Sequence, residues 1–499
     1  MPAASLVIKA YGARMTGGMI PDPPTLMAEP RSDTTNLDDR LALQRRAFAA
    51  APYPAAAERE AQLAALERAL EAHAGAIERA IDADFGGRSV HETRLLELFP
   101  SLEAVRHARR HVPWWMKPER RGVSLWFLPG ANRVWRQPLG VVGIIVPWNY
   151  PLYLAIGPLA GALAAGNRVM IKMSEFTPRT GEAVAAMLRD AFAEDRVAVV
   201  NGGVEVAKAF SRLPFDHLLF TGSTGVGAAV MHAAADRLTP VTLELGGKSP
   251  AIVGPDFSLE TAVERILFGK LVNAGQTCVA PDYVLLPAGR EDDFVEAARA
   301  VVAQRYPRLA DNPDYTAIVN EHQYRRLVGY LDEARAAGAR IEQFNPAGER
   351  LEPAARKLAP ALVVDPPAEL SLVREEIFGP ILPLIPYRTF DEALGYVRAR
   401  PRPLAMYLFD HDAARIERAL TTTHAGGVTL NDTLLHVGQE DLPFGGVGAS
   451  GMGAYHGRAG FETFSKAKGV FRRRRLSGSD WLRPPFGKLF DRLVRLMLR

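Results

Sequence analysis

Short apolar runs alternate with amphipathic segments along most of the chain. The runs have the length of buried strands and lie at residues 141–146, 168–173, 197–200, 217–220 and 241–245. The segments between them have helical spacing and include residues 158–165, 180–192 and 226–238. This alternation predicts a parallel sheet with right-handed crossovers. It resumes between residues 251 and 430, which predicts a second α/β domain.

The pattern is different before residue 141. Residues 58–81 are rich in Ala and Leu at helical spacing and carry alternating charge, which predicts an amphipathic helix pair. Asn36 is placed to cap an earlier helix. Residues 120–140 are rich in turns, and residues 1–35 show no sustained period. We therefore expect residues 1–35 to form a loose N-terminal extension.

Length and composition exclude several classes of protein. At 499 residues and 54.4 kDa, the chain exceeds the size at which one core keeps growing, so two or more domains are expected. The 48% hydrophobic and 23% charged residues are typical of globular proteins. One cysteine excludes an intrachain disulfide, and no apolar run reaches the roughly 20 residues of a membrane span. The N-terminus lacks a signal-peptide pattern, so we expect a cytoplasmic protein.

The net charge of +4 arises at the C-terminal end of the chain. Residues 472–499 contain nine basic and two acidic residues, a balance of +7 that leaves −3 for the rest. The apolar side chains of this tail recur at helical spacing: Phe486, Leu489, Phe490, Leu493, Val494 and Met497. The basic ones lie off that face: Lys488, Arg492, Arg495 and Arg499. The pattern predicts a basic amphipathic helix that docks either on the inner face of a membrane or on protein.

The single cysteine, Cys278, lies in the polar segment NAGQTCVAP at residues 273–281, between two apolar stretches. A polar turn between apolar elements is where a scaffold presents a reactive group. Cys278 is therefore a candidate nucleophile. The alternative is an inert thiol that serves only packing.

A glycine-rich turn after a predicted strand is a candidate cofactor site. Gly222, Ser223 and Gly227 open a predicted helix, where backbone N–H groups can face a phosphate. The spacing is G-x-x-G-x-G, not the usual G-x-G-x-x-G, so an empty strand–helix turn is the alternative. Lys172 and Glu175 follow the strand at 168–173, where they can meet ribose hydroxyls or form a solvated charge pair.

Two further strand ends carry candidate catalytic groups. Glu244 lies among apolar neighbours, and burial raises a carboxyl pKa towards the range of a general base. A pair with Lys248 is the alternative. Asn149 lies in the proline-flanked turn VPWNYP at 146–151, where a rigid amide can donate to an oxyanion. Ordinary turn chemistry is the alternative there.

Together these segments resemble the aldehyde dehydrogenase superfamily, from about residue 40 to about residue 470. The matching motifs are PWN at 147–149, FTGS at 220–223, LELGGK at 243–248, GQTC at 275–278, EEIFGP at 375–380 and PFGG at 443–446. The class 3 branch is indicated by CVAPDY at 278–283 and LPFGGVGASGMGAYHG at 442–457. Within it the chain is most similar to the coniferyl aldehyde dehydrogenases, through ADFGGRS at 83–89, PLAG at 158–161 and DNPDYT at 311–316.

The resemblance implies a mechanism and a cofactor. Cys278 would attack an aldehyde, Asn149 would stabilise the thiohemiacetal oxyanion, and Glu244 would activate water to hydrolyse the resulting thioester. Aromatic aldehydes of the hydroxycinnamyl type, such as coniferyl aldehyde, rank first, with medium-chain aldehydes next. The cofactor would be NAD, with NADP as the alternative, and its implied binding residues are Trp148, Lys172, Glu175, Gly222, Ser223, Gly227, Glu376 and Phe378.

The resemblance also implies an architecture, the aldehyde dehydrogenase fold. A Rossmann-like dinucleotide-binding domain at 36–244 is expected, interrupted by an oligomerisation segment at about 131–140. A catalytic α/β domain would follow at 245–450, then a return segment and oligomerisation strand at 451–474 and the basic tail at 475–499. We expect a homodimer that pairs through a hairpin near residues 132–138 and a strand near 468–472.

Rival functions remain open at this point. A cysteine hydrolase or acyltransferase would use His424 or His436 as the base, but it leaves the glycine-rich turn and the EEIFGP motif without a role. A CoA-acylating dehydrogenase would not need Glu244. A long-chain fatty aldehyde dehydrogenase at a membrane surface fits the basic tail. A non-catalytic relative is disfavoured because all three candidate catalytic residues are present.

Overall fold

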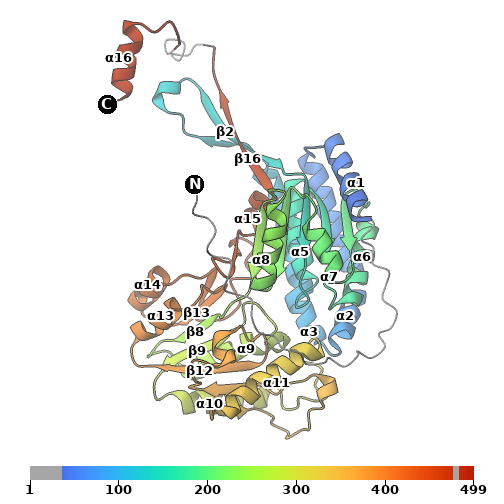
Figure 1. Cartoon of the computed structure of the whole chain (residues 1–499), viewed down its shortest axis with the longest axis vertical. Coiled ribbons are helices and arrows are strands. Elements are labelled where there is room, and N and C mark those ends of the chain that lie inside the picture. The colour runs from blue at the N-terminus through green and yellow to red at the C-terminus, as the bar shows by residue number, and fades with distance from the viewer. Residues whose placement is uncertain (1–35, 476–482, 499) are drawn as a thin grey trace, which may run out of the picture. The chain divides into compact units, whose positions relative to one another are not determined.

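Two large sheets and one small sheet form the framework of the protein (Figure 1). The structure is a computed structural model that describes residues 36–475 and 483–498. The predicted N-terminal extension at 1–35, and residues 476–482 and Arg499 of the predicted tail, therefore lie outside the described residues. The family fold expected from the motifs, with two α/β layers of parallel strands, is confirmed.

The first sheet has six strands in the order β15-β7-β6-β3-β4-β5. They are β3 (Val141–Ile145), β4 (Arg168–Lys172), β5 (Val197–Val200), β6 (His217–Gly222), β7 (Val241–Leu245) and β15 (Gly451–Met452). Strands β3 to β7 are parallel, and β15 is antiparallel to β7. The winding reverses between β3 and β6, and ligands bind outside the carboxyl ends of strands at such a reversal.

Helices cross over between these strands, as the alternation predicted. They are α5 (Tyr153–Ala165), α6 (Pro178–Ala191), α7 (Val204–Ser211) and α8 (Thr224–Ala235). Helix α5 begins five residues before Pro158, the predicted first residue, and every one of its side chains is buried. Proline is common in the first turn of a helix, but here it lies in the interior, so the predicted boundary was wrong.

The second sheet has seven strands in the order β10-β11-β12-β9-β8-β13-β14. They are β8 (Pro250–Val253), β9 (Tyr283–Pro287), β10 (Arg340–Gln343), β11 (Ala361–Val364), β12 (Ile381–Tyr387), β13 (Ala405–Phe409) and β14 (Gly427–Leu430). Only β10 is antiparallel. Its longer helices are α9 (Leu259–Leu271), α10 (Glu291–Arg305), α11 (Glu321–Ala336), α13 (Phe390–Arg398) and α14 (Ala413–Thr422).

The helices before β3 differ from the prediction in one respect. Residues 58–81 belong to one helix, α2 (Ala56–Phe85, 30 residues), and not to a helix pair. Its buried residues Leu63, Leu70, Ile77 and Ile81 keep helical spacing throughout, and no proline interrupts it. Asn36 does stand at the N-cap of α1 (Leu37–Ala50), but its side chain makes no capping hydrogen bond.

Helices α2 and α4 (Phe99–Trp115) flank α5 and complete the cover of the first sheet. Two short turns join α2 to α4: α3 (Val90–Thr93) and the π-helical η2 (Arg94–Leu98).

The small sheet consists of β1 (Glu119–Arg121), β2 (Ala131–Pro138) and β16 (Ser465–Arg472), which are antiparallel to one another. The two segments expected to mediate dimer contact therefore lie side by side in one chain (Figure 1). Strand β16 is largely exposed along its length. A homodimer stays a prediction, as do the domain boundaries given above.

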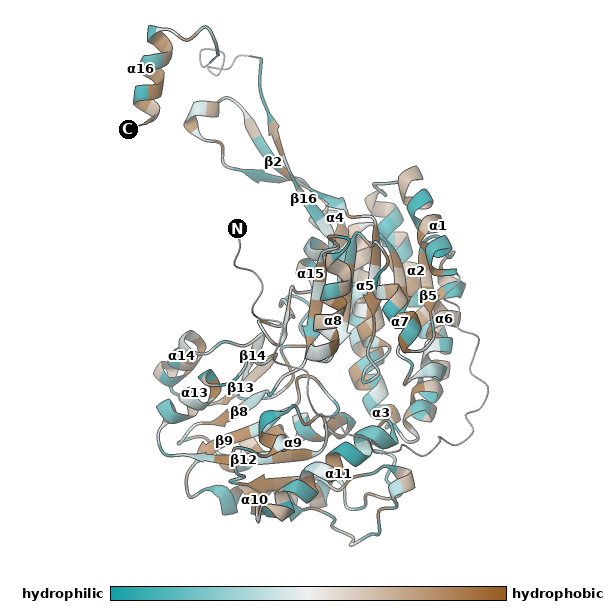
Figure 2. Ribbon diagram, viewed as in Figure 1, coloured by the Kyte–Doolittle hydropathy of each residue, from teal (hydrophilic) through white to brown (hydrophobic). Residues whose placement is uncertain are grey.

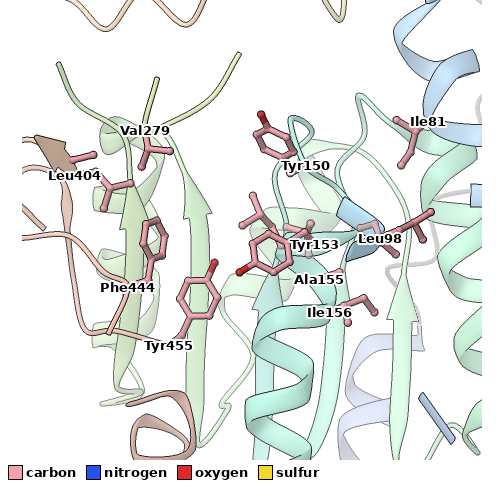
Figure 3. Close-up of a cluster of buried hydrophobic side chains, with 14 of the residues drawn as sticks. Ile81, Leu98, Tyr150, Tyr153, Ala155, Ile156, Val279, Leu404, Phe444 and Tyr455 are labelled. Atoms are coloured by element: carbon pink, nitrogen blue, oxygen red, sulfur yellow. The ribbon is translucent and has the colours of Figure 1, made fainter. Parts of the chain in front are cut away.

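One hydrophobic core joins the two large sheets. It contains Val142 and Ile144 of β3 together with Val284 and Leu286 of β9, all buried. Figure 3 shows part of this core, where Tyr153 and Tyr455 lie opposite one another near Phe444. The strands carry the apolar residues and the outer faces of many helices the polar ones, as the colouring of Figure 2 shows.

The described part of the tail forms the amphipathic helix α16 (Lys488–Met497), as its pattern predicted. None of its side chains is buried, and Leu489 and Leu496 are 55% and 58% exposed. Across residues 36–475 and 483–498, no helix is long and apolar enough to cross a membrane.

Candidate active site

The turn before β9 holds Cys278 in a strained backbone. Asn273 (φ 52°), Ala274 (φ 50°) and Gly275 (φ 76°) are left-handed in succession, and two of them are not glycine. Such residues cost of the order of 1–3 kcal/mol each and cluster at functional sites. A Cβ on Gly275 would collide with the backbone of Gly379, so this position requires glycine.

Side-chain amides fix the shape of this turn. Gln276 donates from Nε2 to the backbone oxygens of Asn273 (2.9 Å) and Ala317 (3.1 Å), and its Oε1 accepts from the N–H of Val319 (2.9 Å). Gln276 is completely buried. The turn is therefore cross-linked to a loop more than 40 residues further along the chain.

The Cys278 thiol is neutral in this environment. Burial, then the nearby Glu376 and Glu244 carboxyls, raise the pKa of Cys278 to about 12, while backbone N–H groups oppose the shift. A thiol must lose its proton to become a nucleophile. Cys278 must therefore lose its proton before it can attack a carbonyl carbon.

Glu244 is a buried carboxyl whose oxygens both lack a hydrogen-bond partner within the described residues. It lies in β7 next to the last residue of the strand, and burial raises the pKa of Glu244 well above its usual range. Lys248, the suggested ion-pair partner, instead donates to the Asp282 carboxylate and to the backbone oxygens of Leu372 and Glu375. An unpartnered buried carboxyl of this kind is a candidate functional group.

Asn149 reaches the cysteine turn from the end of β3. Its Nδ2 donates to the backbone oxygen of Gln276 at 3.2 Å, and the side chain is buried. An amide nitrogen carries two protons, so one N–H remains for a substrate oxygen. The backbone oxygen of Asn149 accepts from Arg88 Nη1 at 2.8 Å and from Asn273 Nδ2 at 3.1 Å.

Glu376 and Phe378 border the same region from the second sheet. A Cβ on Gly246 would overlap the carboxyl of Glu376, so the glycine allows that close approach. Burial is the main reason that the pKa of Glu376 rises to about 8, and a hydrogen bond from the Gly247 N–H opposes the rise. Phe378, itself left-handed at φ 52°, meets Trp148 edge-on with ring centroids 5.3 Å apart.

A cavity of about 570 Å³ opens between these groups and the glycine-rich turn. Its lining includes Thr224, Gly246, Gly247, Lys248, Glu376 and Ala449. The turn itself runs from Gly222 at the end of β6, through the exposed Ser223, into helix α8.

Gly227 lies one turn into helix α8 and is buried against the end of β7. A Cβ there would meet the Leu245 side chain at 2.6 Å. The helix can therefore approach the strand closely, and its N-terminus lies directly after the carboxyl end of β6. This fits the phosphate of a dinucleotide.

Lys172 and Glu175 occupy different environments at the end of β4. Lys172 is buried, its Nζ donates to the backbone oxygen of Met173 at 2.6 Å, and burial lowers the pKa of Lys172. Glu175 is exposed in the following turn. The two form no ion pair in the described structure, so the alternative of a solvated pair was wrong for the lysine.

The sequence profile of the Aldehyde dehydrogenase family matches residues 24–470. The chain belongs to the aldehyde dehydrogenase family. The match begins upstream of the expected start near residue 40, so part of the region before Asn36 does have a family counterpart.

Two comparisons with other aldehyde dehydrogenases extend this result. The chain is 55% identical over 94% of its length to a probable coniferyl aldehyde dehydrogenase of Pseudomonas aeruginosa, 97% of which is covered. It also resembles the solved structure of Staphylococcus aureus AldH in its substrate-bound state, with TM-score 0.87, 35% identity and coverage of 93% and 99% of the two chains. The predicted likeness to coniferyl aldehyde dehydrogenases is confirmed, and relatives of the class 3 branch match as well.

A third comparison concerns the cofactor. An aldehyde dehydrogenase of Mycobacterium tuberculosis, solved with NAD+, has TM-score 0.79, 30% identity and coverage of 88% and 90% of the two chains.

The rival cysteine hydrolase gains no support in this aldehyde dehydrogenase. His436 Nδ1 is hydrogen-bonded to Thr429 Oγ1 at 2.7 Å. Burial lowers the pKa of His436 to about 4. No hydrogen bond within the described residues joins it or His424 to the thiol. A histidine with so low a pKa is a poor proton acceptor at neutral pH.

Sequence reasoning missed two buried residues behind the site, Arg88 and Glu97. Arg88 lies in a motif used only for the family resemblance, and Glu97 lies in an amphipathic stretch where a surface position is expected. Neither carries a local signal, because the backbone groups that they bind lie about 60 residues away in sequence.

Proposed function

We propose that this aldehyde dehydrogenase oxidises an aldehyde to the carboxylic acid through a thioester on Cys278. The observation that carries the proposal is the convergence of a lone thiol, an amide and an unpartnered buried carboxyl, Cys278, Asn149 and Glu244, from three separate segments. These are the nucleophile, the oxyanion donor and the general base that the reaction requires.

In the first step the thiol would lose its proton to the solvent, and Sγ would form a bond to the carbonyl carbon as the C=O electron pair moves onto the oxygen. The free N–H of Asn149 and the backbone N–H of Cys278 would donate to the resulting oxyanion. When bound, the nicotinamide cofactor accepts the hydride that this carbon loses. Glu244 then takes a proton from water, whose oxygen attacks the thioester and releases the acid and the thiol. Mixing the protein with NAD and an aldehyde should raise absorbance at 340 nm, and no rise would contradict the oxidation.

The cofactor would be held by the groups at the ends of the parallel strands. The pyrophosphate would lie at Gly222, Ser223 and Gly227, the adenosine ribose at Lys172 and Glu175, and the nicotinamide ribose at Glu376, beside Phe378 and Trp148. The exposed Glu175 carboxylate would accept from a ribose 2′-hydroxyl and repel a 2′-phosphate. The Lys172 ammonium is already bonded to Met173. NAD is therefore favoured over NADP. We expect kcat/KM for NAD divided by kcat/KM for NADP to exceed one, and a ratio below one would contradict this preference.

The substrate we propose is an aromatic aldehyde of the hydroxycinnamyl type. Buried aromatic side chains contact the residues on either side of the thiol: Tyr150 bonds to Thr277 at 2.6 Å, and Tyr407 donates to the backbone oxygen of Val279. Tyr150 and Tyr455 belong to the same hydrophobic core as Val279 (Figure 3). The relative from Pseudomonas aeruginosa carries the name of a coniferyl aldehyde dehydrogenase. Tyr283, another aromatic residue near the motifs, instead packs against Tyr396. Ranking a panel of aldehydes by kcat/KM tests the class, and a preference for small charged semialdehydes would contradict it.

We also propose a homodimer that forms through β2 and β16. Val470 and Phe471 of β16 are 38% and 50% exposed, and an apolar strand edge needs cover. Light scattering at micromolar concentration should give twice the chain mass, and a monomer would contradict the proposal.

The exposed apolar face of α16 supports a lipid surface as its docking partner. Its basic residues would add roughly 1 kcal/mol each near anionic headgroups. Co-sedimentation with vesicles of anionic and of neutral lipid, for the full chain and for a chain ending at Arg475, tests this. Selective loss of anionic-vesicle binding on truncation is expected. Equal sedimentation of both chains would contradict lipid binding by α16 and would favour docking of the helix on protein. It would also remove the support for a membrane-bound fatty aldehyde dehydrogenase.

A further inference from the structure

A buried arginine lies directly behind the Asn149 turn. The Arg88 side chain has 0% exposure, and its Nη1 donates to the backbone oxygen of Asn149 at 2.8 Å. The guanidinium lies over the rings of Phe85 and Tyr150, 4.8 and 5.0 Å from their centroids. Taking a guanidinium out of water is costly. The chain therefore maintains this cation at the site for a reason other than packing.

Glu97 is the acidic partner of Arg88 and supplies a second anchor. Its Oε1 lies 3.4 Å from Arg88 Nη1, and the Glu97 side chain is also 0% exposed. Its Oε2 accepts from the backbone N–H groups of Leu152 (2.7 Å) and Tyr153 (3.3 Å), at the start of α5. The pair therefore holds the backbone of Asn149 and the first residues of the helix that follows it.

The backbone of Arg88 is itself fixed. Its N–H donates to Asp82 Oδ1 at 2.8 Å, and the neighbouring Gly87 oxygen accepts from the Ala317 N–H at 2.8 Å. Ala317 also accepts from Gln276 of the cysteine turn. Arg88 is thus attached to the same loop that fixes the nucleophile turn.

We propose that Arg88, anchored by Glu97, is a positioning residue that orients the Asn149 amide towards the oxyanion of the thiohemiacetal. The inference rests on the proposed role of Asn149. Oxyanion donors act only when they are aimed where the charge develops, and a small misplacement is expensive in rate. Loss of Arg88 would leave the Asn149 carbonyl with only the weaker bond from Asn273 and slow thioester formation.

A double-mutant cycle on the NADH burst tests this. Arg88→Met should lower the burst rate about 10- to 100-fold and leave the KM for NAD within about twofold, because the residues proposed to hold the pyrophosphate and the adenosine ribose lie at the ends of β6 and β4. In an Asn149→Ala background, Arg88→Met should add less than about threefold, because the group that it positions is gone. Arg94→Met, at an exposed arginine paired with Glu78, is the control and should behave like the parent.

Arg88→Lys keeps the charge without the planar fork and should give an intermediate burst rate. If Arg88→Met does not fold, the double-mutant cycle can be carried out with Arg88→Lys instead. A parent-like burst rate in the Arg88 variants would overturn the inference, and so would equal slowing in both backgrounds, since Arg88 would then act independently of Asn149. A parent-like burst in Asn149→Ala alone would overturn the oxyanion role itself, which separates the two failures.

Discussion

The turn that carries Cys278 and the turn that opens helix α8 are held in different ways. Buried Gln276 ties the first turn to itself and to a distant loop through three hydrogen bonds. In the second turn the Ser223 side chain makes no capping bond, and a 3.2 Å bond from Thr224 to the Ala449 oxygen links it to the rest. The difference fits the proposed roles, since a nucleophile has to be placed by the protein's own contacts, whereas a turn that binds phosphate keeps its N–H groups available for the ligand.

The largest effect is expected at the nucleophile itself. Cys278→Ala should lower turnover at least about 10,000-fold, since removal of a nucleophile has effects of that size. NAD affinity, measured by quenching of protein fluorescence, should stay within about threefold because the glycine-rich turn that opens helix α8 is unchanged. Turnover near the parent rate would remove Cys278 from the mechanism.

The two turns can be compared directly with one alanine in each. Gln276→Ala should lower kcat about 100-fold, because a displaced nucleophile loses its attack geometry. Ser223→Ala, the matched change in the open turn, should alter kcat and the KM for NAD by about twofold or less. Steady-state kinetics with both variants check this. Similar losses in the two would mean that the turns do not differ in the way proposed.

A smaller effect is expected from filling the space between helix α8 and the end of β7. Gly227→Ala puts a Cβ against Leu245, and overpacking of this kind costs about 1–3 kcal/mol. The KM for NAD should rise about 10-fold with little change in kcat. Titration with NAD at saturating aldehyde measures both, and Gly225→Ala, where a Cβ meets open space, is the control. A fall in kcat at unchanged KM would place Gly227 on the chemical side of the site.

The smallest expected effect concerns pH. The folded chain holds a proton on Glu376 up to about pH 8, whereas the ordinary pKa is 4.5. Between these values the folded state binds more protons than the unfolded state, so the free energy of unfolding falls as pH rises. Glu376→Gln should flatten that slope. Urea unfolding at several pH values measures it, and an unchanged slope would assign the effect to other groups.

The elements predicted best are those whose pattern is set by burial. Strands β5 and β7 end where the apolar runs end, because a strand buried on both faces allows few polar residues. The prediction of a helix pair at 58–81 was wrong. This stretch contains no proline, and its composition does not limit how long one helix can be. Pro158 was a misleading start signal, since the N-terminus of α5 is stabilised by Glu97, a residue far away in sequence.

The candidate site shows the same division. Cys278, Glu244 and Asn149 could be singled out as candidates because each follows or ends an apolar run, and their catalytic roles stay predictions. The left-handed Asn273 and Ala274 could not, because strain of this kind is imposed by surrounding packing and not by residue type. Arg88 likewise could not be predicted, because its contact with the Asn149 carbonyl exists only in the folded chain.

The most direct test of the account is the intact mass of the Glu244→Gln variant, quenched in acid after mixing with NAD and coniferyl aldehyde. Without its general base the enzyme should form the thioester and fail to hydrolyse it. The predicted result is a mass increase of one acyl group, located on the peptide that contains Cys278, together with one equivalent of NADH. An unmodified protein that still releases NADH, or an acyl group on another residue, would contradict the account.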